Sequence, residues 1–443
     1  MMLNKLQLKE STMAYPKVLI IHSPKVNFAD ANADAIVLRT LFQEWPRENL
    51  HQIFYSNNIN DIGFFKSYYC FKFHDRRFGY FYDLLFGGKN NFNKIDDHAK
   101  TKKMSVINKI KSILKKSFSG FIDIVFFPII NKKLKDFLDK VRPDFIYTQG
   151  YTIRNINLTL KIASKLHIPY IIHPLDDWAA NSLIENNNII LKYYWKYYAK
   201  RLFNGAAVRL AVSKAMKEEY EKRYKNNWHI IPVIAAYNNI EHTDYKNPIK
   251  DWKFNCGNKN IAFCYTGSLG GGRNKAILQL ANKLSEFNSN NVIKSAIFLF
   301  THNLDKIGML IDHECIIING PVESKYIPLI LEASDILLIA ESFEICDAKT
   351  NKFVLSSKVP FYTKSNKPIL VIGNENNGTV SCAMENQWGL TLTDINALNV
   401  SRIFEILISE VSQFYTKNAI DFWEKQLNPV KIRKEFLNHF IHF

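Results

Sequence analysis

Residues 267–275, with the sequence GSLGGGRNK, join a glycine-rich run to two cations. An apolar strand-like run, 261–266, precedes this glycine loop, and a helical pattern follows it. Glycines allow close backbone approach, N–H groups at a helix start attract anions, and cations neutralise their charge. The loop matches neither GxGxxG nor a Walker loop, so it indicates a phosphate-bearing ligand of unspecified kind. An ordinary glycine-rich turn is the alternative. The candidate contacts are Gly267, Ser268, Gly270, Gly271, Arg273 and Lys275.

A second polar cluster follows the apolar run at 168–172, where HPLDDW places His173, Asp176 and Asp177. A carboxylate at a strand end could orient a substrate hydroxyl or accept its proton. The alternative is that the two aspartates cap the next turn. Neighbouring aspartates could also suggest a metal, but no histidine or carboxylate cluster completes a site, and we predict none. His22 and Ser23 end the first strand pattern, and we place them on the opposite wall of the same site.

The segment 100–116 is basic and contains no acidic residue. On a helix its apolar side chains share one face, and lysines flank or oppose that face. This pattern is typical of a helix in a membrane interface, where each lysine near anionic lipid contributes about 1 kcal/mol. A core-facing helix with solvated lysines is the alternative. The predicted membrane contacts are Lys109, Lys111, Lys115 and Lys116.

Length and composition limit the remaining possibilities. A chain of 443 residues with 47% hydrophobic residues is long enough for two domains with separate cores. We find no signal peptide and no apolar run of membrane-spanning length. The six cysteines form no CxxC pair, which favours reduced thiols in a cytoplasmic protein. The net charge of +17 suggests nucleic acid, but no nucleic-acid-binding motif supports that partner.

Strand and helix patterns alternate along both halves of the chain. This order predicts an α/β fold of two Rossmann-like, doubly wound parallel-sheet domains that face each other across a cleft. We assign residues 1–250 to the first domain, with a basic aromatic insert at about 60–130. Residues 251–420 form the second, and a helical tail at 421–443 packs back on the first. The polar stretch 238–260 is the expected linker, and 394–414 is expected to be helical.

The chain resembles the GT-B glycosyltransferases, specifically the large retaining group numbered family 4, which uses nucleotide sugars. The best matching segments are YTGSLGGGRNKAILQLA (265–281), INGPVESKYIPLILEASDILL (318–338) and SSKVPFYTKSNKPILVIG (356–373). Weaker matches are IPYIIHPLDDW and LAVSKAMKEEYEKRY. The resemblance covers most of the chain outside about 60–130.

By this resemblance the glycine loop approaches the donor diphosphate, and Arg273 or Lys275 neutralises it. Val322 follows the turn that meets the nucleobase, and Ser357 and Lys358 precede a helix aimed at the sugar and phosphates. A surface arginine and a simple strand–helix connection are the alternatives. Relatives carry two glutamates eight positions apart, where this chain has Phe353 and Phe361. Glu341, Glu344 and Asp347 are the acidic residues that offer a substitute.

The resemblance places His173, Asp176 and Asp177 near the reacting sugar or acceptor, and His22 and Ser23 beside the acceptor. It implies transfer from a nucleotide sugar to a surface-glycan or lipid-linked acceptor, without a metal or other cofactor and with retained anomeric configuration. We expect a peripheral protein on the inner face of the cytoplasmic membrane. Two other hypotheses remain. The two phenylalanines suggest a catalytically silent GT-B scaffold, and the net charge alone suggests a nucleic-acid-binding protein.

Overall fold

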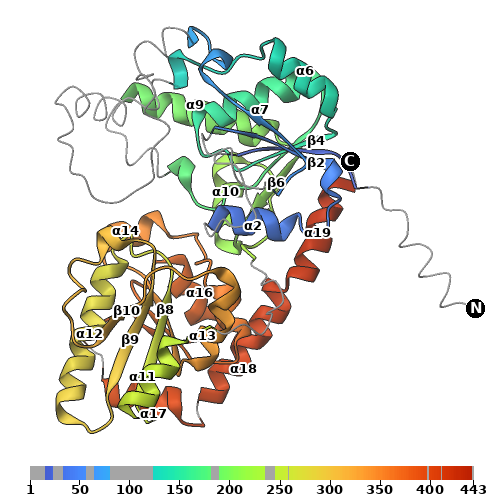
Figure 1. Ribbon diagram of the computed structural model, residues 1–443. Helices are drawn as coiled ribbons and strands as arrows, with labels where there is room; N and C mark the ends of the chain where they lie inside the picture. Colours follow the sequence, from blue (N-terminus) through green and yellow to red (C-terminus); the bar gives the residue numbers. More distant parts are fainter. Residues whose placement is uncertain are drawn as a thin grey trace, which may run out of the picture.

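The computed structural model describes residues 15–22, 33–55, 64–79, 123–180, 189–234, 245–257, 259–396, 399–410 and 412–441. Figure 1 shows two α/β halves, one above the other, with the last helices running along one side of both. A seven-stranded sheet lies in the first half and a six-stranded sheet in the second, and each pairing between neighbouring strands is parallel. The predicted architecture of two parallel-sheet α/β domains is confirmed.

The first sheet has the strand order β3-β2-β1-β4-β5-β6-β7. The order reverses between β1 and β4, which makes their carboxyl ends the topological switch point, where ligands bind in such sheets. Its strands are β1 (Val18–Ile21), β2 (Leu50–Phe54), β3 (Ser67–Cys70), β4 (Phe145–Thr148), β5 (Tyr170–Ile172), β6 (Val208–Ala211) and β7 (His229–Ile230). Its helices are α2 (Ala33–Leu41), α6 (Lys132–Val141), α7 (Ile153–Leu166), α9 (Ile189–Gly205) and α10 (Lys214–Tyr224).

The second sheet has the order β10-β9-β8-β11-β12-β13, with its switch point between β8 and β11. Its strands are β8 (Ile261–Thr266), β9 (Ser295–Phe300), β10 (Ile316–Ile318), β11 (Ile336–Ala340), β12 (Ile369–Ile372) and β13 (Leu390–Leu392). Its helices are α11 (Pro248–Cys256), α12 (Arg273–Asn290), α13 (Ile327–Ala333), α14 (Ile345–Thr350), α15 (Val359–Lys364), α16 (Gly378–Asn386), α17 (Val400–Ile408) and α18 (Ser412–Phe422). Short 3-10 turns lie at Arg47–Asn49, Phe73–Asp75, Leu304–Lys306 and Ser324–Tyr326.

Capping residues explain where several helices begin. The side chain of Ser213 accepts a hydrogen bond from the Met216 N–H and starts α10. Two expectations need correction. The predicted linker contains α11, which Asn247 caps and which has Pro248 in its first turn, a placement that suits a residue without an N–H. The helix predicted at 394–414 is two helices, because α17 ends before Ser409 and α18 begins at Ser412.

The final helix connects the halves. After α18, a π-helical segment (Trp423–Leu427) leads into α19 (Pro429–Ile441), which Figure 1 shows reaching from the lower half to the upper one. There the rings of Phe436 and Phe440 pack against Phe42, directly after α2, with centroid distances of 5.2 and 6.4 Å. Arg433 also donates to the carboxylate of Glu44 at 2.8 Å. The C-terminal helix therefore completes the core of the N-terminal half.

Candidate active site

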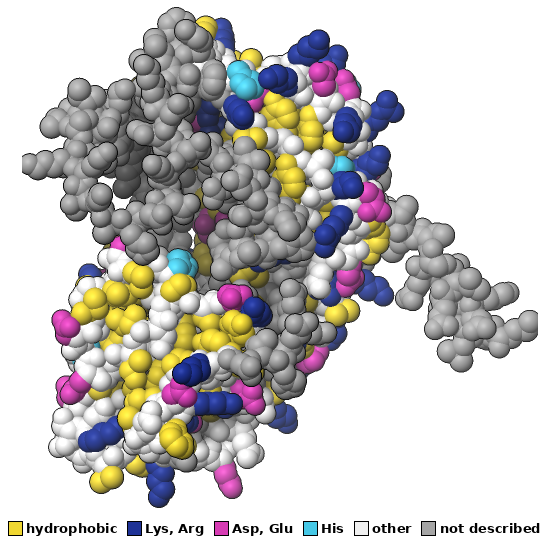
Figure 2. All heavy atoms as spheres, viewed as in Figure 1, with side chains coloured by type: hydrophobic (Ala, Val, Ile, Leu, Met, Phe, Trp, Pro, Cys, Tyr) yellow, Lys and Arg dark blue, Asp and Glu magenta, His cyan; other side chains and the backbone are white. Residues whose placement is uncertain are grey.

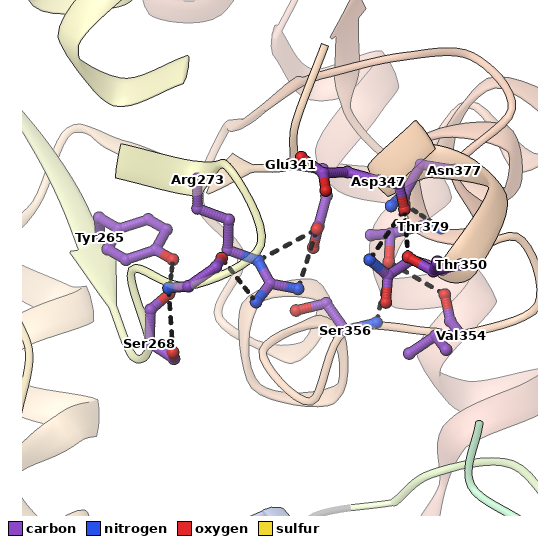
Figure 3. Close-up of polar contacts among 12 residues, drawn as sticks. Tyr265, Ser268, Arg273, Glu341, Asp347, Thr350, Val354, Ser356, Asn377 and Thr379 are labelled. Carbon is purple, nitrogen blue, oxygen red and sulfur yellow. Dashed lines mark hydrogen bonds and ion pairs between the residues drawn. The ribbon is translucent and has the colours of Figure 1, made fainter. Parts of the chain in front are cut away.

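A buried ion pair occupies the switch point of the second sheet. Arg273 is the first residue of α12, and Glu341 directly follows β11, so two neighbouring strands bring them together. Nε and Nη2 of Arg273 lie 3.0 and 2.9 Å from Oε2 of Glu341. Figure 3 shows the two side chains pointing toward each other. Burial lowers the pKa of Arg273, but Glu341, with smaller effects of Tyr265 and Asp347, outweighs burial and the net shift is upward. The guanidinium therefore stays charged at this edge of the sheet.

A second cation, Lys358, lies at the same edge. It precedes α15, is only 8% exposed, and its ammonium lies 4.6 Å from the centre of the Tyr265 ring. A Cβ built on Gly267 would be 3.1 Å from its Cε, so the lysine borders the glycine loop. Burial and the nearby Arg273 lower the pKa of Lys358 to about 7, although Glu341 opposes this shift. Because this pKa lies near neutrality, a bound anion would favour the protonated form.

The glycine loop is held tightly at one end and open at its tip. Gly272 has φ of +76°, and a Cβ there would lie 2.4 Å from the Ser342 hydroxyl and 2.6 Å from the Asp347 carboxylate. Gly271 also has positive φ, but a Cβ there would meet nothing within 4 Å. The hydroxyl of Ser268 accepts from the Gly270 N–H at 3.2 Å. Only glycine fits at 272, whereas the exposed tip leaves room for a ligand to approach the backbone.

The other predicted donor contacts lie at different distances from this pair. Ser357 is half-buried and directly precedes Lys358, while Lys275 is exposed on the first turn of α12. Val322 follows β10 and packs partly buried against a hydrophobic cluster, two strands away from β8. The structure thus groups Gly267, Arg273 and Lys358 with Glu341, and it places Val322 at the far side of the sheet edge.

Neither phenylalanine at the aligned glutamate positions belongs to the polar cluster. Phe361, in α15, packs against a hydrophobic cluster of the second half. Phe353 lies between α14 and α15 and is buried in the core of the first half, where its carbonyl accepts from the Ser213 hydroxyl at 3.2 Å. The Arg223 guanidinium of α10 lies 5.8 Å from the Phe353 ring and also binds Asp177. Loops from the carboxyl ends of both sheets therefore meet in the same region.

The switch point of the first sheet carries neutral polar side chains. His22 follows β1 and Gln149 follows β4, and both are almost fully buried. Burial lowers the pKa of His22 to about 4, against a smaller opposing effect of Gln149, so the imidazole is neutral at pH 7. Neither amide atom of Gln149 nor Nε2 of His22 makes a hydrogen bond of ordinary geometry. Buried polar groups seldom lack partners, which makes this a candidate site for a hydrogen-bonding ligand.

Acidic groups border these two side chains. Burial raises the pKa of Tyr151, and the negative charges of Asp176 and Asp34 raise it further. Asp176 is half-buried, and burial also raises the pKa of Asp34 at the start of α2. Gln149 is the functional candidate that our sequence reading missed. The available signal was a polar residue directly after a buried parallel strand.

Two predicted catalytic residues are engaged elsewhere. The fully buried His173 ring accepts from the Tyr147 hydroxyl at 2.8 Å and lies 2.9 Å from the Ile231 carbonyl. Both ring nitrogens are therefore used in the core, which corrects the expectation that His173 lines the cleft. Asp177 accepts from the Arg223 guanidinium at 2.8 Å, from Tyr220 and from the Ala180 N–H, so it joins α10 and caps a turn. This is the capping alternative, and it leaves Asp176 at the sheet edge.

Several predictions fall beyond what can be placed. Ser23 and the lysines at 109, 111, 115 and 116 lie outside the described residues. Within the described ranges, no group of three or more His, Cys, Asp or Glu side chains is arranged to hold a metal ion. Within those ranges, too, no helix has both the length and the hydrophobicity needed to cross a bilayer.

Comparison with known proteins gives one family match and many structural ones. Residues 100–234 match the model of Glycosyltransferase Family 4. The matched range contains HPLDDW and the helix capped by Ser213. It also includes residues 100–130, which lie in the region that the sequence resemblance left out. No curated protein matches the chain by sequence.

Three solved structures resemble almost the whole chain. HepE of Anabaena in complex with UDP-glucose has a TM-score of 0.59 at 13% identity, covering 97% of this chain and 100% of its own. Sucrose-phosphate synthase of Thermosynechococcus elongatus gives 0.58 at 12% identity, covering 94% and 96%. WaaG, a glycosyltransferase involved in lipopolysaccharide biosynthesis, gives 0.52 at 10% identity, covering 95% and 98%. At such low identity these likenesses show the fold.

The two parallel-sheet domains have the GT-B fold of these solved structures. The family match adds that residues 100–234, within the first half of the chain, are similar to Glycosyltransferase Family 4.

Proposed function

We propose that the chain transfers a sugar from a nucleotide-diphosphate sugar to a surface-glycan or lipid-linked acceptor at a membrane. The observation that carries this proposal is that two cations, Arg273 and Lys358, lie beside the glycine loop. This is the switch point where nucleotide ligands bind in sheets of this kind. The complex of the similar HepE with UDP-glucose supports a nucleotide sugar as donor.

In the proposed reaction, the bond between the anomeric carbon and the diphosphate oxygen breaks while an acceptor hydroxyl oxygen bonds to that carbon. Negative charge grows on the departing diphosphate, and Arg273 and Lys358 stabilise it. The acceptor attacks from the face that the diphosphate leaves, which retains the anomeric configuration, and a phosphate oxygen takes the hydroxyl proton. The two cations serve as the countercharge, so we propose that transfer requires no metal ion. Glu341 positions the Arg273 guanidinium.

The acceptor side of this proposal lies at the switch point of the first sheet. His22 is neutral at pH 7 and Gln149 is an amide, so both suit the hydroxyl groups of a sugar. Asp176 is one of two carboxylates at this edge, with Asp34, and can orient the reacting hydroxyl. A neutral polar surface opposite a cationic one matches a donor with a charged leaving group and an acceptor with hydroxyls.

We propose that the protein works on the inner face of the cytoplasmic membrane, with the lysines at 109, 111, 115 and 116 among its contacts. Nucleic acid is not the expected partner. Figure 2 shows lysine and arginine side chains at separate points over both halves, interspersed with acidic and neutral ones on this face. Weak nonspecific binding to DNA and RNA at physiological salt is the expected result, and tight, steeply salt-dependent binding would favour the nucleic-acid hypothesis.

A thermal-shift panel of nucleotide diphosphates and nucleotide sugars tests the donor site. A ligand present at 100 times its Kd adds about 2.7 kcal/mol of stability. We expect a shift with one nucleotide, lost in Arg273→Ala and kept in Lys283→Ala, which removes a cation further along α12. Addition of EDTA should leave the shift and the transfer rate unchanged. No shift with any nucleotide would favour the catalytically silent scaffold.

A further inference from the structure

Helix α9 presents an unusual outer face. Four large apolar side chains on it are exposed: Ile189 (81%), Ile190 (56%), Tyr193 (67%) and Tyr197 (44%). Each other helix in the described ranges carries at most one exposed large apolar side chain. Solvent contact with so much apolar surface is unfavourable, and a concentrated patch of this kind marks an interaction surface.

The buried side of α9 explains why this face points outward. Leu191, Trp195 and Ala199 are buried in the core of the first half, and they recur every four residues along the helix. A helix needs one such face for its own domain. The exposed apolar residues lie on the remaining surface, so the fold of the domain does not account for them.

Cations accompany the exposed apolar residues. The helix contains Lys192, Lys196, Lys200 and Arg201 and no acidic residue. Arg201 donates to the Tyr197 hydroxyl at 3.2 Å, so a cation and an aromatic ring are held side by side. Tyrosine beside lysine and arginine suits the boundary between lipid headgroups and acyl chains, where an amphipathic ring has an apolar body in lipid and a hydroxyl in water.

We propose that this face of α9 docks on an anionic lipid bilayer. Ile189, Ile190 and Tyr193 enter the interface at the start of the helix, while Lys196, Lys200 and Arg201 bind acidic headgroups further along it. The proposal rests on the membrane association proposed above and is independent of the predicted lysine contacts at 109–116. It commits to lipid because the face combines positive charge with aromatic and branched apolar groups.

The position of α9 gives this contact a role. Ala180, which follows the acceptor edge, and Ile189, the first residue of α9, are nine positions apart in the chain. The distance between them is therefore no more than about 30 Å. Figure 1 shows α9 on the upper half, which carries that edge. A bilayer against the start of α9 would lie within reach of the acceptor edge, as a lipid-linked acceptor requires.

Vesicle flotation of the full chain tests the proposal. Vesicles of 70% phosphatidylcholine and 30% phosphatidylglycerol should bind the wild type, and phosphatidylcholine alone should bind it much less. Two double variants test the face, Ile189→Ser/Tyr193→Ser and Lys196→Glu/Lys200→Glu. We expect each to lower the partition coefficient between water and the anionic vesicles at least tenfold, since one lysine near anionic lipid contributes about fivefold. The matched control is Lys133→Glu/Lys135→Glu on α6, where both lysines are exposed.

Each outcome has a distinct meaning. The proposal is overturned if both α9 variants float with the vesicles as the wild type does, or if the wild type does not bind anionic vesicles. A dimer that the serine variants separate, without vesicle binding, would assign the face to a second copy instead. A nucleotide thermal shift equal to that of the wild type shows that the variants are folded. The same measurement separates this proposal from sugar transfer. Vesicle binding without any nucleotide shift would support membrane docking by α9 and would contradict the proposed donor site.

Discussion

The switch points of the two sheets carry opposite kinds of side chain. Between β8 and β11, Arg273 and Glu341 form a buried ion pair and Lys358 stands beside them. Between β1 and β4, His22 and Gln149 are neutral and have side-chain atoms that make no hydrogen bond of ordinary geometry. The same fold therefore provides two edges, one built around charge and the other around hydrogen bonds.

The difference lies in how complete each site is in the absence of a ligand. At the charged edge the Arg273–Glu341 pair neutralises its own charges, because an unpaired buried charge would be very costly. The neutral edge tolerates amide and imidazole atoms in poor hydrogen-bond geometry, whose cost is smaller. A donor would therefore have to rearrange existing contacts, whereas an acceptor would supply missing ones. Four predictions test this contrast, beginning with the largest effect.

Removing one partner of the ion pair should destabilise the charged edge most. We expect Arg273→Ala to lower the free energy of unfolding by about 3 kcal/mol, because Glu341 is only 2% exposed and would be left as a buried unpaired charge. Urea unfolding measures the change. The double variant Arg273→Met/Glu341→Gln should recover most of the loss, and equal losses in both variants would mean that the pair is not the cause.

The glycine loop should respond unequally at adjacent positions. Gly271→Ala and Gly272→Ala both place a side chain at positive φ, which costs roughly 1–2 kcal/mol. Gly272→Ala must in addition displace Ser342 and Asp347, so we expect it to be the less stable of the two and to weaken nucleotide binding. Thermal unfolding with and without nucleotide checks this order. Equal stability of the two variants would contradict the tight contact at 272.

Lys358 should make the charged edge depend on pH. Its pKa is about 7 in the folded chain against an ordinary value of 10.5, so the unfolded chain binds more protons between these values. The contribution of this group to stability therefore increases as pH rises from 7 to 10.5. Deprotonation removes a cation from the site, and we expect nucleotide-sugar affinity to fall about tenfold from pH 6 to pH 9.

Calorimetric titrations across this range measure the pH effect on binding. The control is Lys358→Arg, which stays protonated throughout and should give a nearly flat profile. If the wild type is equally flat, Lys358 does not contact the diphosphate.

The neutral edge should show the smallest change in stability. In Gln149→Leu an amide that makes no hydrogen bond of ordinary geometry is replaced by an apolar group of similar size, so we expect unfolding free energy within about 0.5 kcal/mol of the wild type. The nucleotide thermal shift should persist while transfer to the acceptor falls. A large loss of stability would instead assign Gln149 a structural role. Gln149→Glu adds a charge to the buried site and should be much less stable.

Much of the fold could be predicted from sequence because its signals are local. Buried apolar runs mark the strands, and polar caps such as Ser213 mark helix starts. The helix in the supposed linker could also have been found, since Asn247 followed by Pro248 is a start signal.

The site was less accessible because it depends on contacts between distant residues. Arg273 was identified from its glycine loop, but its pairing with Glu341, 68 positions away, follows from the adjacency of β8 and β11. His173 occupies the expected place after a strand, yet its ring turns inward to Tyr147. A linear pattern gives the position of a side chain along an element and leaves its direction undetermined.

The path of α19 has a consequence for biosynthesis. The helix follows every other described element in the chain, yet Ile432, Phe436 and Phe440 belong to the core of the first sheet. During translation, the N-terminal half therefore exposes this part of its hydrophobic core until the second sheet and α19 have been synthesised. A nascent chain stalled before α19 should bind chaperones through the apolar side chains of Phe42 and Trp45, which α19 covers in the folded protein, and release of the last helix should end that binding.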